Sequence, residues 1–278
     1  MGNIIFLASY PKSGNTWLRV FLINLFANAR RPLAPGRASD LSTADNTEYW
    51  YTAVDSSDPA TWTRAHVARL RHKMQRELAS RTDDTIFIKS HAALLPMEGV
   101  PPFAPDVLAG AVYIVRNPLD IAPSYARHNQ LAIHRTVNVM NQNNFITARR
   151  GGLMEYLQGG WSQNVLSWTR APNPRIHVMR YEDMVADPLA AFGGLTRFLQ
   201  LEVTPERLER AVANSSIDTL RDLEDKEGFH EQSREGVRFF GQGGVDAWKR
   251  DLPEAQARRI VERHRAQMAR FNYVPAGW

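Results

Sequence analysis

A turn with the composition of a phosphate-binding loop lies near the start of the chain, at Ser9–Thr16 (SYPKSGNT). An ATP-binding Walker A loop has the pattern G-x-x-x-x-G-K-S/T, in which the lysine reaches the β- and γ-phosphates. In this chain Gly14 and Thr16 occupy the second glycine and the hydroxyl position. Asn15 stands where the lysine is required, and Lys12 lies three positions earlier. Glycine-containing turns before a helix direct backbone N–H groups at anions, so the sequence predicts a nucleotide phosphate site that disfavours ATP hydrolysis.

A second candidate phosphate site follows an apolar run at 111–115 (AVYIV). Arg116 comes directly after this predicted strand, and Asn117 is a favoured helix N-cap. Pro118 suits the first helical position and Asp120 the third. The arginine is therefore expected at the carboxyl end of a strand beside a helix N-terminus, where a phosphate is favourable. A surface ion pair is the alternative role for this arginine.

These stretches resemble the cytosolic-type sulfotransferases, which use 3′-phosphoadenosine 5′-phosphosulfate (PAPS). The family's 5′-phosphosulfate loop has the sequence Tyr-Pro-Lys-Ser-Gly-Thr-Thr-Trp, and residues 10–17 match it with one difference, at Asn15. The resemblance implies that Lys12 binds the leaving phosphate and the bridging oxygen, and that Trp17 flanks the adenine. The family's 3′-phosphate site is an arginine followed eight residues later by a serine, a spacing that Arg116 and Ser124 keep.

A third motif, at 87–94 (FIKSHAAL), resembles the family's Lys-Thr-His-Leu-Pro without its proline. The resemblance implies that His91 is the general base that deprotonates the acceptor hydroxyl. It also implies that Lys89, together with Lys12, is a catalytic cation. A histidine just after a buried strand is otherwise mostly structural. The other seven histidines show no metal-ligand spacing, so no metal is expected.

The C-terminal motif departs from the family pattern Arg-Lys-Gly-x-x-Gly-Asp-Trp-Lys. Aligned on Trp248 and Lys249, residues 241–249 have the sequence GQGGVDAWK, so both expected cations are missing. Backbone N–H groups of the glycine-rich turn are still able to cradle a phosphate. Arg238, or Arg234 before it, is expected to supply the charge.

Two weaker matches complete the resemblance. It assigns Tyr181, in the stretch Tyr-Glu-Asp-Met, to the adenine pocket; the structural alternative is a core tyrosine with Glu182 and Asp183 capping the next turn. It also assigns Ser215 to a nucleotide contact. The residues expected to bind the nucleotide are Lys12, Ser13, Gly14, Asn15, Thr16, Trp17, Arg116, Ser124, Tyr181, Ser215, Arg238, Gly241, Gln242 and Gly243.

Strands and helices that position these motifs alternate along the chain. Continuous apolar or β-branched runs, typical of parallel strands covered on both faces, occur at 3–8, 85–89, 111–115 and 175–180. Helices are predicted at about 17–28, 64–80, 118–128, 153–170, 188–200, 204–213 and 253–271. This alternation predicts an α/β fold, a P-loop-like doubly wound and mainly parallel sheet flanked by helices, as a single domain over 1–278. The ranges 30–63 and 129–145 lack clear elements and are expected to be substrate loops or lids.

Composition narrows the classes of function. The 278 residues are 44% hydrophobic and 23% charged, with a net charge of +5. The absence of cysteine excludes disulfides and thiol catalysis. No apolar run approaches the ~18 residues of a membrane span, and PKSGNT interrupts the N-terminal apolar stretch, so we expect no signal peptide and a cytoplasmic protein. No aromatic-basic module supports nucleic-acid binding.

The sequence therefore predicts a sulfotransferase that moves the sulfuryl group from PAPS to a hydroxyl of a small acceptor and releases adenosine 3′,5′-bisphosphate. A phenol or other small alcohol is the preferred acceptor, and a sugar hydroxyl is second. Two alternatives stay open: a P-loop-type nucleotide kinase, although no convincing Walker B carboxylate is found, and a catalytically degraded nucleotide-binding relative. The family's dimer segment has no counterpart near the C-terminus, and no oligomeric state is predicted.

Overall fold

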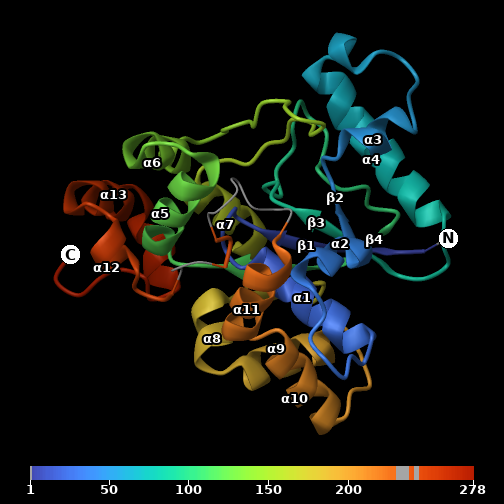
Figure 1. The fold of residues 1–278 in the computed structure, drawn as a ribbon. Coiled ribbons are helices and arrows are strands. Elements are labelled where there is room, and N and C mark those ends of the chain that lie inside the picture. The colour runs from blue at the N-terminus through green and yellow to red at the C-terminus, as the bar shows by residue number, and fades with distance from the viewer. Residues whose placement is uncertain (1, 230–237, 241–243) are drawn as a thin grey trace. The chain divides into compact units, whose positions relative to one another are not determined.

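Five strands form one sheet in the computed structural model, which describes residues 2–229, 238–240 and 244–278 (Figure 1). The strand order is β2-β3-β1-β4-β5. Their bounds are Ser42–Ala44 for β2, Ile86–Ser90 for β3, Ile4–Ser9 for β1, Leu108–Val115 for β4 and Ile176–Arg180 for β5. β3 pairs in parallel with both β1 and β2. The predicted α/β fold with a parallel sheet is confirmed, and four of its strands were predicted from their apolar runs.

The register of β1 and β3 brings their carboxyl ends together. Ala8 pairs with Ser90, so the segments that follow the two strands leave the sheet at the same edge. The residues that face the core on these strands are apolar, and Ile4, Leu7 and Ile88 are fully buried. Burial of such side chains is the main favourable contribution to folding.

The chain divides into two compact units. The first comprises residues 1–10, 42–113 and 139–176, and the second comprises 11–41, 114–138 and 177–278. Both β4 and β5 begin in the first unit and end in the second.

Three α-helices lie wholly within the described residues of the first unit. They are α3 (Glu48–Thr52), α4 (Arg64–Ser80) and α7 (Trp161–Thr169). Figure 1 shows α3 beside α4. The prediction that the last of these helices begins at residue 153 is wrong. It begins at Trp161 because Gly159 has a φ of +69°, outside the helical region, and Gly160 is the N-cap.

The second unit is mainly helical. Its helices are α1 (Asn15–Phe26), α2 (Ala38–Leu41), α5 (Pro118–Asn129), α8 (Tyr181–Ala186), α9 (Pro188–Phe198), α10 (Pro205–Asn214), α11 (Ile217–Glu227), α12 (Trp248–Asp251) and α13 (Glu254–Arg270). Figure 1 shows α9 and α10 beside α1. The Arg207 side chain of α10 donates to the carbonyl oxygen of Leu25 near the end of α1, with an Nη2–O distance of 2.8 Å.

The two ranges predicted to lack clear elements contain regular structure. The range 30–63 contains β2, α2 and α3 as well as two 3₁₀ turns, at Pro35–Arg37 and Pro59–Thr61. The range 129–145 contains the whole of α6 (Ile133–Asn141), which runs from the second unit into the first. β2 is an edge strand of three residues, too short to give an apolar run in the sequence. Among the described residues, no helix has the length and apolar composition needed to cross a bilayer.

Candidate active site

The phosphate loop, residues 11–16, turns the chain from β1 into α1 through two left-handed residues. Lys12 has a φ of +68° and Gly14 a φ of +104°. A Cβ atom at Gly14 would lie 2.8 Å from a ring carbon of Tyr181. Glycine is thus required here for the backbone angle and for space, and the turn brings two predicted nucleotide-binding residues, Gly14 and Tyr181, into contact.

Polar groups suited to an anion line this loop. Ser13 is fully buried, and within the described parts of the chain its Oγ has no hydrogen-bond partner. The first turn of α1 presents backbone N–H groups at its N-terminus. The buried Arg19 of α1 donates to the hydroxyl of Thr16 over 3.2 Å, bringing a positive charge next to the loop. These donors fit a phosphate group. Sequence analysis missed Arg19, although an arginine inside an apolar helix was a visible signal.

Arg116 links three predicted nucleotide-binding segments. Its guanidinium donates from Nη1 to the carbonyl oxygen of Lys12 over 2.9 Å and from Nη2 to that of Gly244 over 3.3 Å. It also lies over the ring of Tyr181, 4.0 Å from the ring centroid, in a cation–π contact. Only 5% of Arg116 is exposed. The alternative of a surface ion pair is therefore wrong, since the side chain is buried among the segments that the prediction assigned to the nucleotide.

Glu182 fixes the corner that carries Arg116. Its carboxylate accepts a hydrogen bond from the backbone N–H of Asn117 over 3.0 Å and from the hydroxyl of Tyr273 over 2.5 Å. Burial, with the negative charge of Glu182 beside it, raises the pKa of the Tyr273 hydroxyl. Sequence analysis missed this contact because Tyr273 follows α13 and lies 91 residues from Glu182 in the chain.

Asp120 holds the C-terminal turn, residues 244–248, against the start of α5. Its buried carboxylate accepts from the backbone N–H groups of Asp246 over 3.0 Å and of Trp248 over 2.9 Å. Burial raises the pKa of Asp120, and these hydrogen bonds and Arg116 counteract the rise. The sequence placed Asp120 correctly in the first turn of the helix but gave no sign of its partners.

Aromatic rings surround the phosphate loop within the second unit. Trp17 packs edge-on against Tyr181 and Phe192, with centroid distances of 5.8 and 5.7 Å. The Lys12 ammonium lies over the ring of Phe239, 4.0 Å from its centroid. Tyr181 and Trp17 are each 5% exposed, so both are largely core residues in this structure. Their contact with adenine stays a prediction.

The remaining predicted nucleotide-binding residues have varied surroundings. Ser124 is partly exposed on α5. Ser215 is buried, and its hydroxyl donates to the carbonyl oxygen of Ala211, which caps the end of α10. Arg238 is exposed and pairs with Asp225 over 2.5 Å. Arg234, Gly241, Gln242 and Gly243 lie outside the described residues.

The base segment, residues 89–92, leaves the end of β3 in the first unit. The Nδ1 atom of His91 lies 2.8 Å from the carbonyl oxygen of Ser9 and 3.2 Å from its hydroxyl. A carbonyl only accepts hydrogen bonds, so Nδ1 carries the proton and the neutral ring has its lone pair on Nε2. The side chain of Asn164 donates to the carbonyl oxygen of His91 over 3.2 Å. The ring and the backbone of His91 are thus both anchored.

A buried carboxylate that sequence analysis missed lies beside this segment. Asp45 is 2% exposed, and its Oδ2 accepts from the Ser90 hydroxyl over 2.7 Å. Burial raises the pKa of Asp45, while the charges of Arg71 and Lys89 and the bond from Ser90 oppose that rise. The predicted catalytic residue Lys89 is therefore close enough to this carboxylate to influence its charge. Among the described residues, no group of three or more histidine, cysteine, aspartate or glutamate side chains is arranged to hold a metal ion.

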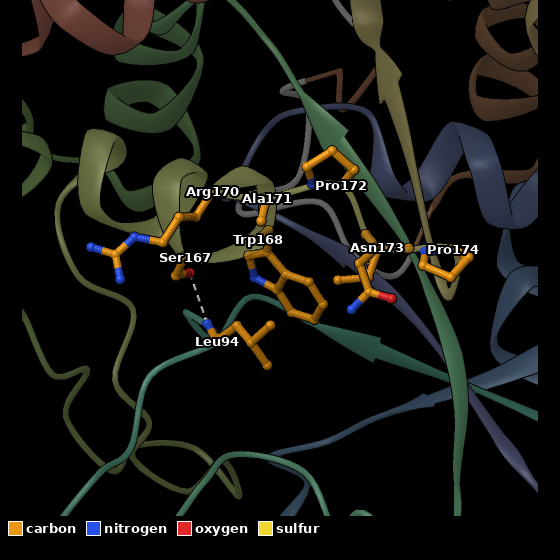
Figure 2. Close-up of a pocket in the computed structure, with 9 residues that line it drawn as sticks. Leu94, Ser167, Trp168, Arg170, Ala171, Pro172, Asn173 and Pro174 are labelled. Carbon is orange, nitrogen blue, oxygen red and sulfur yellow. Dashed lines mark hydrogen bonds between the residues drawn. The ribbon is translucent and has the colours of Figure 1, made fainter.

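A cavity of about 420 Å³ lies in the first unit near the end of α7. Figure 2 shows its lining, which is formed by Leu94, Ser167, Trp168, Arg170, Ala171, Pro172, Asn173, Pro174 and Ile176. The Leu94 N–H donates to the Ser167 hydroxyl over 2.9 Å, the dashed line in Figure 2. None of the predicted site residues lines this cavity, so it gives no support to an acceptor site there.

Comparison with known proteins identifies relatives over almost the whole chain. A family model described as a sulfotransferase domain matches residues 3–272. Sulfotransferase 1E1 of Mus musculus is 23% identical over 271 residues, which cover 94% of this chain and 82% of the relative. Cytosolic sulfotransferase 6 of Arabidopsis thaliana is 25% identical over 275 residues, covering 92% of this chain and 75% of the relative.

Solved structures agree in fold. The mouse sulfotransferase SULT7A1 complexed with PAP has a TM-score of 0.62 at 19% identity and covers 96% of this chain and 84% of that chain. Retinol dehydratase in complex with retinol and PAP has a TM-score of 0.65 at 17% identity and covers 95% of this chain and 81% of that chain. At these identities the likeness concerns the fold alone, and it confirms the predicted P-loop-like α/β architecture.

Proposed function

We propose that this chain, which belongs to the sulfotransferase family, uses PAPS to sulfate the hydroxyl of a small phenol or alcohol with His91 as general base. PAPS supplies the sulfuryl group, and adenosine 3′,5′-bisphosphate is the second product. The observation that carries the proposal is the hydrogen bond from His91 Nδ1 to the Ser9 carbonyl. It leaves Nε2 as the atom that accepts the acceptor's proton.

The phosphate loop and the corner at Arg116 bind the donor. The buried Ser13 hydroxyl and the first turn of α1 receive the 5′-phosphate, and Lys12 offsets charge on the bridging oxygen. Arg116 recognises the 3′-phosphate with its planar guanidinium. Sulfuryl transfer resembles phosphoryl transfer, so positioning and electrostatics provide most of the rate enhancement.

The other predicted residues have supporting roles in this proposal. Lys89 offsets charge on the sulfuryl oxygens, and Trp17 and Tyr181 form the walls of the adenine pocket. Ser124 and Ser215 assist at the nucleotide. Residues 241–243 cradle the 3′-phosphate with their backbone N–H groups, while Arg238 or Arg234 supplies charge. We expect no metal requirement, because lysines suffice for a group less negative than a phosphoryl group.

The acceptor is proposed to be a small molecule. Structures of retinol dehydratase contain PAP together with a small molecule, retinol in one structure and androsterone in another. In this chain the 30–63 range presents Tyr49, which is 66% exposed, and aromatic side chains commonly line acceptor pockets. We propose that 30–63 and 129–145 contribute to acceptor binding in a single sulfotransferase domain, that the protein acts in the cytoplasm, and that nucleic acid is not a partner.

An acceptor screen tests this proposal. Purified protein is incubated with PAPS and panels of phenols, aliphatic alcohols, sugars and amines, and bisphosphate release is followed. Release that depends on a phenol or alcohol is expected. Release only with sugars or amines would contradict the proposed acceptor class.

A thermal-shift measurement tests the kinase alternative. Adenosine 3′,5′-bisphosphate is compared with ATP and magnesium, and a kinase would be stabilised by ATP alone. Bisphosphate binding without transfer to any acceptor would favour a degraded relative.

A further inference from the structure

Asp45 is hydrogen-bonded to the base segment through both its backbone N–H and its side-chain carboxylate. Asp45 directly follows edge strand β2, and its N–H donates to the carbonyl oxygen of Lys89 over 2.9 Å. Its Oδ2 accepts from the Ser90 hydroxyl over 2.7 Å, and the Ser90 oxygen in turn accepts from the N–H of Ala92 over 3.1 Å. The residues on both sides of His91 are therefore tied to one buried carboxylate.

The other side of Asp45 is fixed by a buried polar chain. The hydroxyl of Tyr51, in α3, donates to the Asp45 carbonyl oxygen over 2.9 Å. Arg71, in α4, donates from Nε to the Tyr51 hydroxyl over 3.0 Å and from Nη2 to the Glu155 carbonyl oxygen over 3.0 Å. Asp45, Tyr51 and Arg71 are each at most 2% exposed. A charge buried this deeply is tolerated because an opposite charge and hydrogen bonds accompany it.

These contacts affect the efficiency of a general base because the rate of proton transfer depends on the exact position of the base. A base works only within hydrogen-bond reach of the proton that it takes, and a displacement of about 1 Å costs roughly 100-fold in rate. The His91 ring is held at Nδ1 by Ser9, in the neighbouring strand β1. That bond fixes the direction of Nε2 only if the backbone of His91 stays in place. Asp45 adds a restraint on the residues on either side, Ser90 and Ala92, beside the pairing of Ser90 with Ala8 in β1 and the bond from the Trp168 indole N–H to the Ala92 carbonyl oxygen.

We propose that Asp45 is a positioning residue for the general base, acting through the hydroxyl of Ser90. It helps to fix the backbone at His91 and couples residues 45–51 to the base. The inference rests on the proposed role of His91. It also gives Tyr51 a structural role behind Asp45, whereas Tyr49 in the same helix is exposed.

Ser90→Ala is the direct test, because it deletes the hydroxyl between Asp45 and Ala92 and changes little else. We expect kcat to fall about tenfold, with the KM for PAPS and the Kd for adenosine 3′,5′-bisphosphate changed less than about twofold. Ser90→Thr keeps the hydroxyl and should restore kcat. Ser80→Ala is the matched control, because the exposed Ser80 hydroxyl donates to the carbonyl oxygen of Glu77 at the end of α4, within its own helix. It should leave kcat unchanged.

Two further measurements separate positioning from a general loss of structure. In a His91→Ala background, Ser90→Ala should reduce the residual turnover no further, because the effect acts through His91. Hydrogen exchange of a peptide covering 89–94 should quicken in Ser90→Ala, since the Ala92 N–H loses its acceptor. Asp45→Ala, which removes the acceptor of the Ser90 hydroxyl, is the second variant if Ser90→Ala does not fold, and it should lower kcat in the same way.

The outcomes distinguish this inference from the proposed function. Full turnover in His91→Ala would overturn the role of His91. An inactive His91→Ala together with an unchanged kcat in folded Ser90→Ala or Asp45→Ala would overturn the role of Asp45 alone. Equal losses of bisphosphate affinity and kcat in Ser90→Ala would also overturn it, because a positioning effect on the base leaves nucleotide binding intact.

Discussion

The phosphate loop and the base segment are held in place by different kinds of contact. The phosphate loop takes its shape from its own backbone, with left-handed residues at Lys12 and Gly14 followed directly by α1. The base segment is an ordinary strand end whose position depends on side chains distant in sequence, such as Asp45 and Asn164. We therefore expect substitutions within the phosphate loop itself to be poorly tolerated. We expect the base segment to be sensitive also to substitutions of residues distant in sequence.

Removal of the Lys12 ammonium should have the largest effect on the phosphate loop. Loss of one hydrogen-bond donor to developing charge costs about 10²–10³ in kcat, and in the proposed function the same ammonium also contacts bound PAPS before the reaction. Lys12→Ala should therefore lower kcat by about that factor and also raise the Kd for adenosine 3′,5′-bisphosphate. Steady-state kinetics and calorimetric titration measure the two effects. Turnover in Lys12→Ala equal to that of the native chain would contradict the assignment.

Substitution of Gly14 tests whether the loop depends on its backbone and on the close approach of Tyr181. Gly14→Ala imposes a left-handed alanine and a contact of 2.8 Å with the Tyr181 ring, which together cost about 1–3 kcal/mol. The Kd for the bisphosphate should rise about tenfold or more.

Gly99→Ala is the matched control for Gly14, because Gly99 has a φ of +78° but a Cβ atom added there would meet nothing within 4 Å. It carries the backbone cost without the clash and should leave nucleotide affinity unchanged. Equal Kd values for the two variants would show that the contact with Tyr181 has no part in binding.

Substitution of Asp120 should have a smaller effect on nucleotide binding. Asp120→Asn replaces one carboxylate oxygen by an NH₂ group, which cannot accept from the N–H of Asp246 or Trp248. One buried N–H then loses its acceptor, at about 1–3 kcal/mol. Hydrogen exchange at 244–249 should quicken and the bisphosphate Kd should rise severalfold. Asp246→Asn, an exposed change in the same turn, is the control. Unaltered hydrogen exchange in Asp120→Asn would show that the Asp120 carboxylate does not hold residues 244–248 in place.

The smallest predicted effect is a pH dependence in the first unit. Hydrogen bonds from Ser57, with His66 nearby, lower the pKa of Asp55 from 3.8 to about 2. A depressed carboxyl pKa adds stability that is present above the ordinary pKa and is lost as the pH falls through the folded one. The difference in Tm between the native chain and Asp55→Asn should therefore shrink as the pH falls from 3.8 to about 2. A difference in Tm that stays constant over this pH range would contradict the lowered pKa of Asp55.

The same contrast explains what sequence analysis predicted. The phosphate loop, its strand and its helix were recognised because residue type and spacing within a few positions determine the turn. The position of Arg116 directly after β4 and the cap at Asn117 were predicted for the same reason, and the cap is confirmed by the bond from the Leu119 N–H to the Asn117 side chain. Asp45 and Glu182 were missed as supporting residues because their partners are 45 and 65 or more positions away in the chain. Long-range pairs of this kind leave no local pattern.

Elements were missed where local signals were weak. β2 has three residues, Ser42–Ala44, and gains its stability from pairing with β3 rather than from an apolar run. α11 is amphipathic with charged residues in most turns, and its N-cap bond, from the Thr219 N–H to Ser216, was not recognised in the sequence. In both cases tertiary packing decides the structure that propensity leaves open.

The most direct test of the account compares turnover and nucleotide affinity in His91→Ala. If His91 acts only as the base, kcat with a good acceptor should fall by about 10²–10⁴, while the Kd for adenosine 3′,5′-bisphosphate stays within about twofold of the native value. Single-turnover transfer from labelled PAPS, with calorimetric titration on the same preparation, measures both. Unchanged transfer to the acceptor would contradict the account.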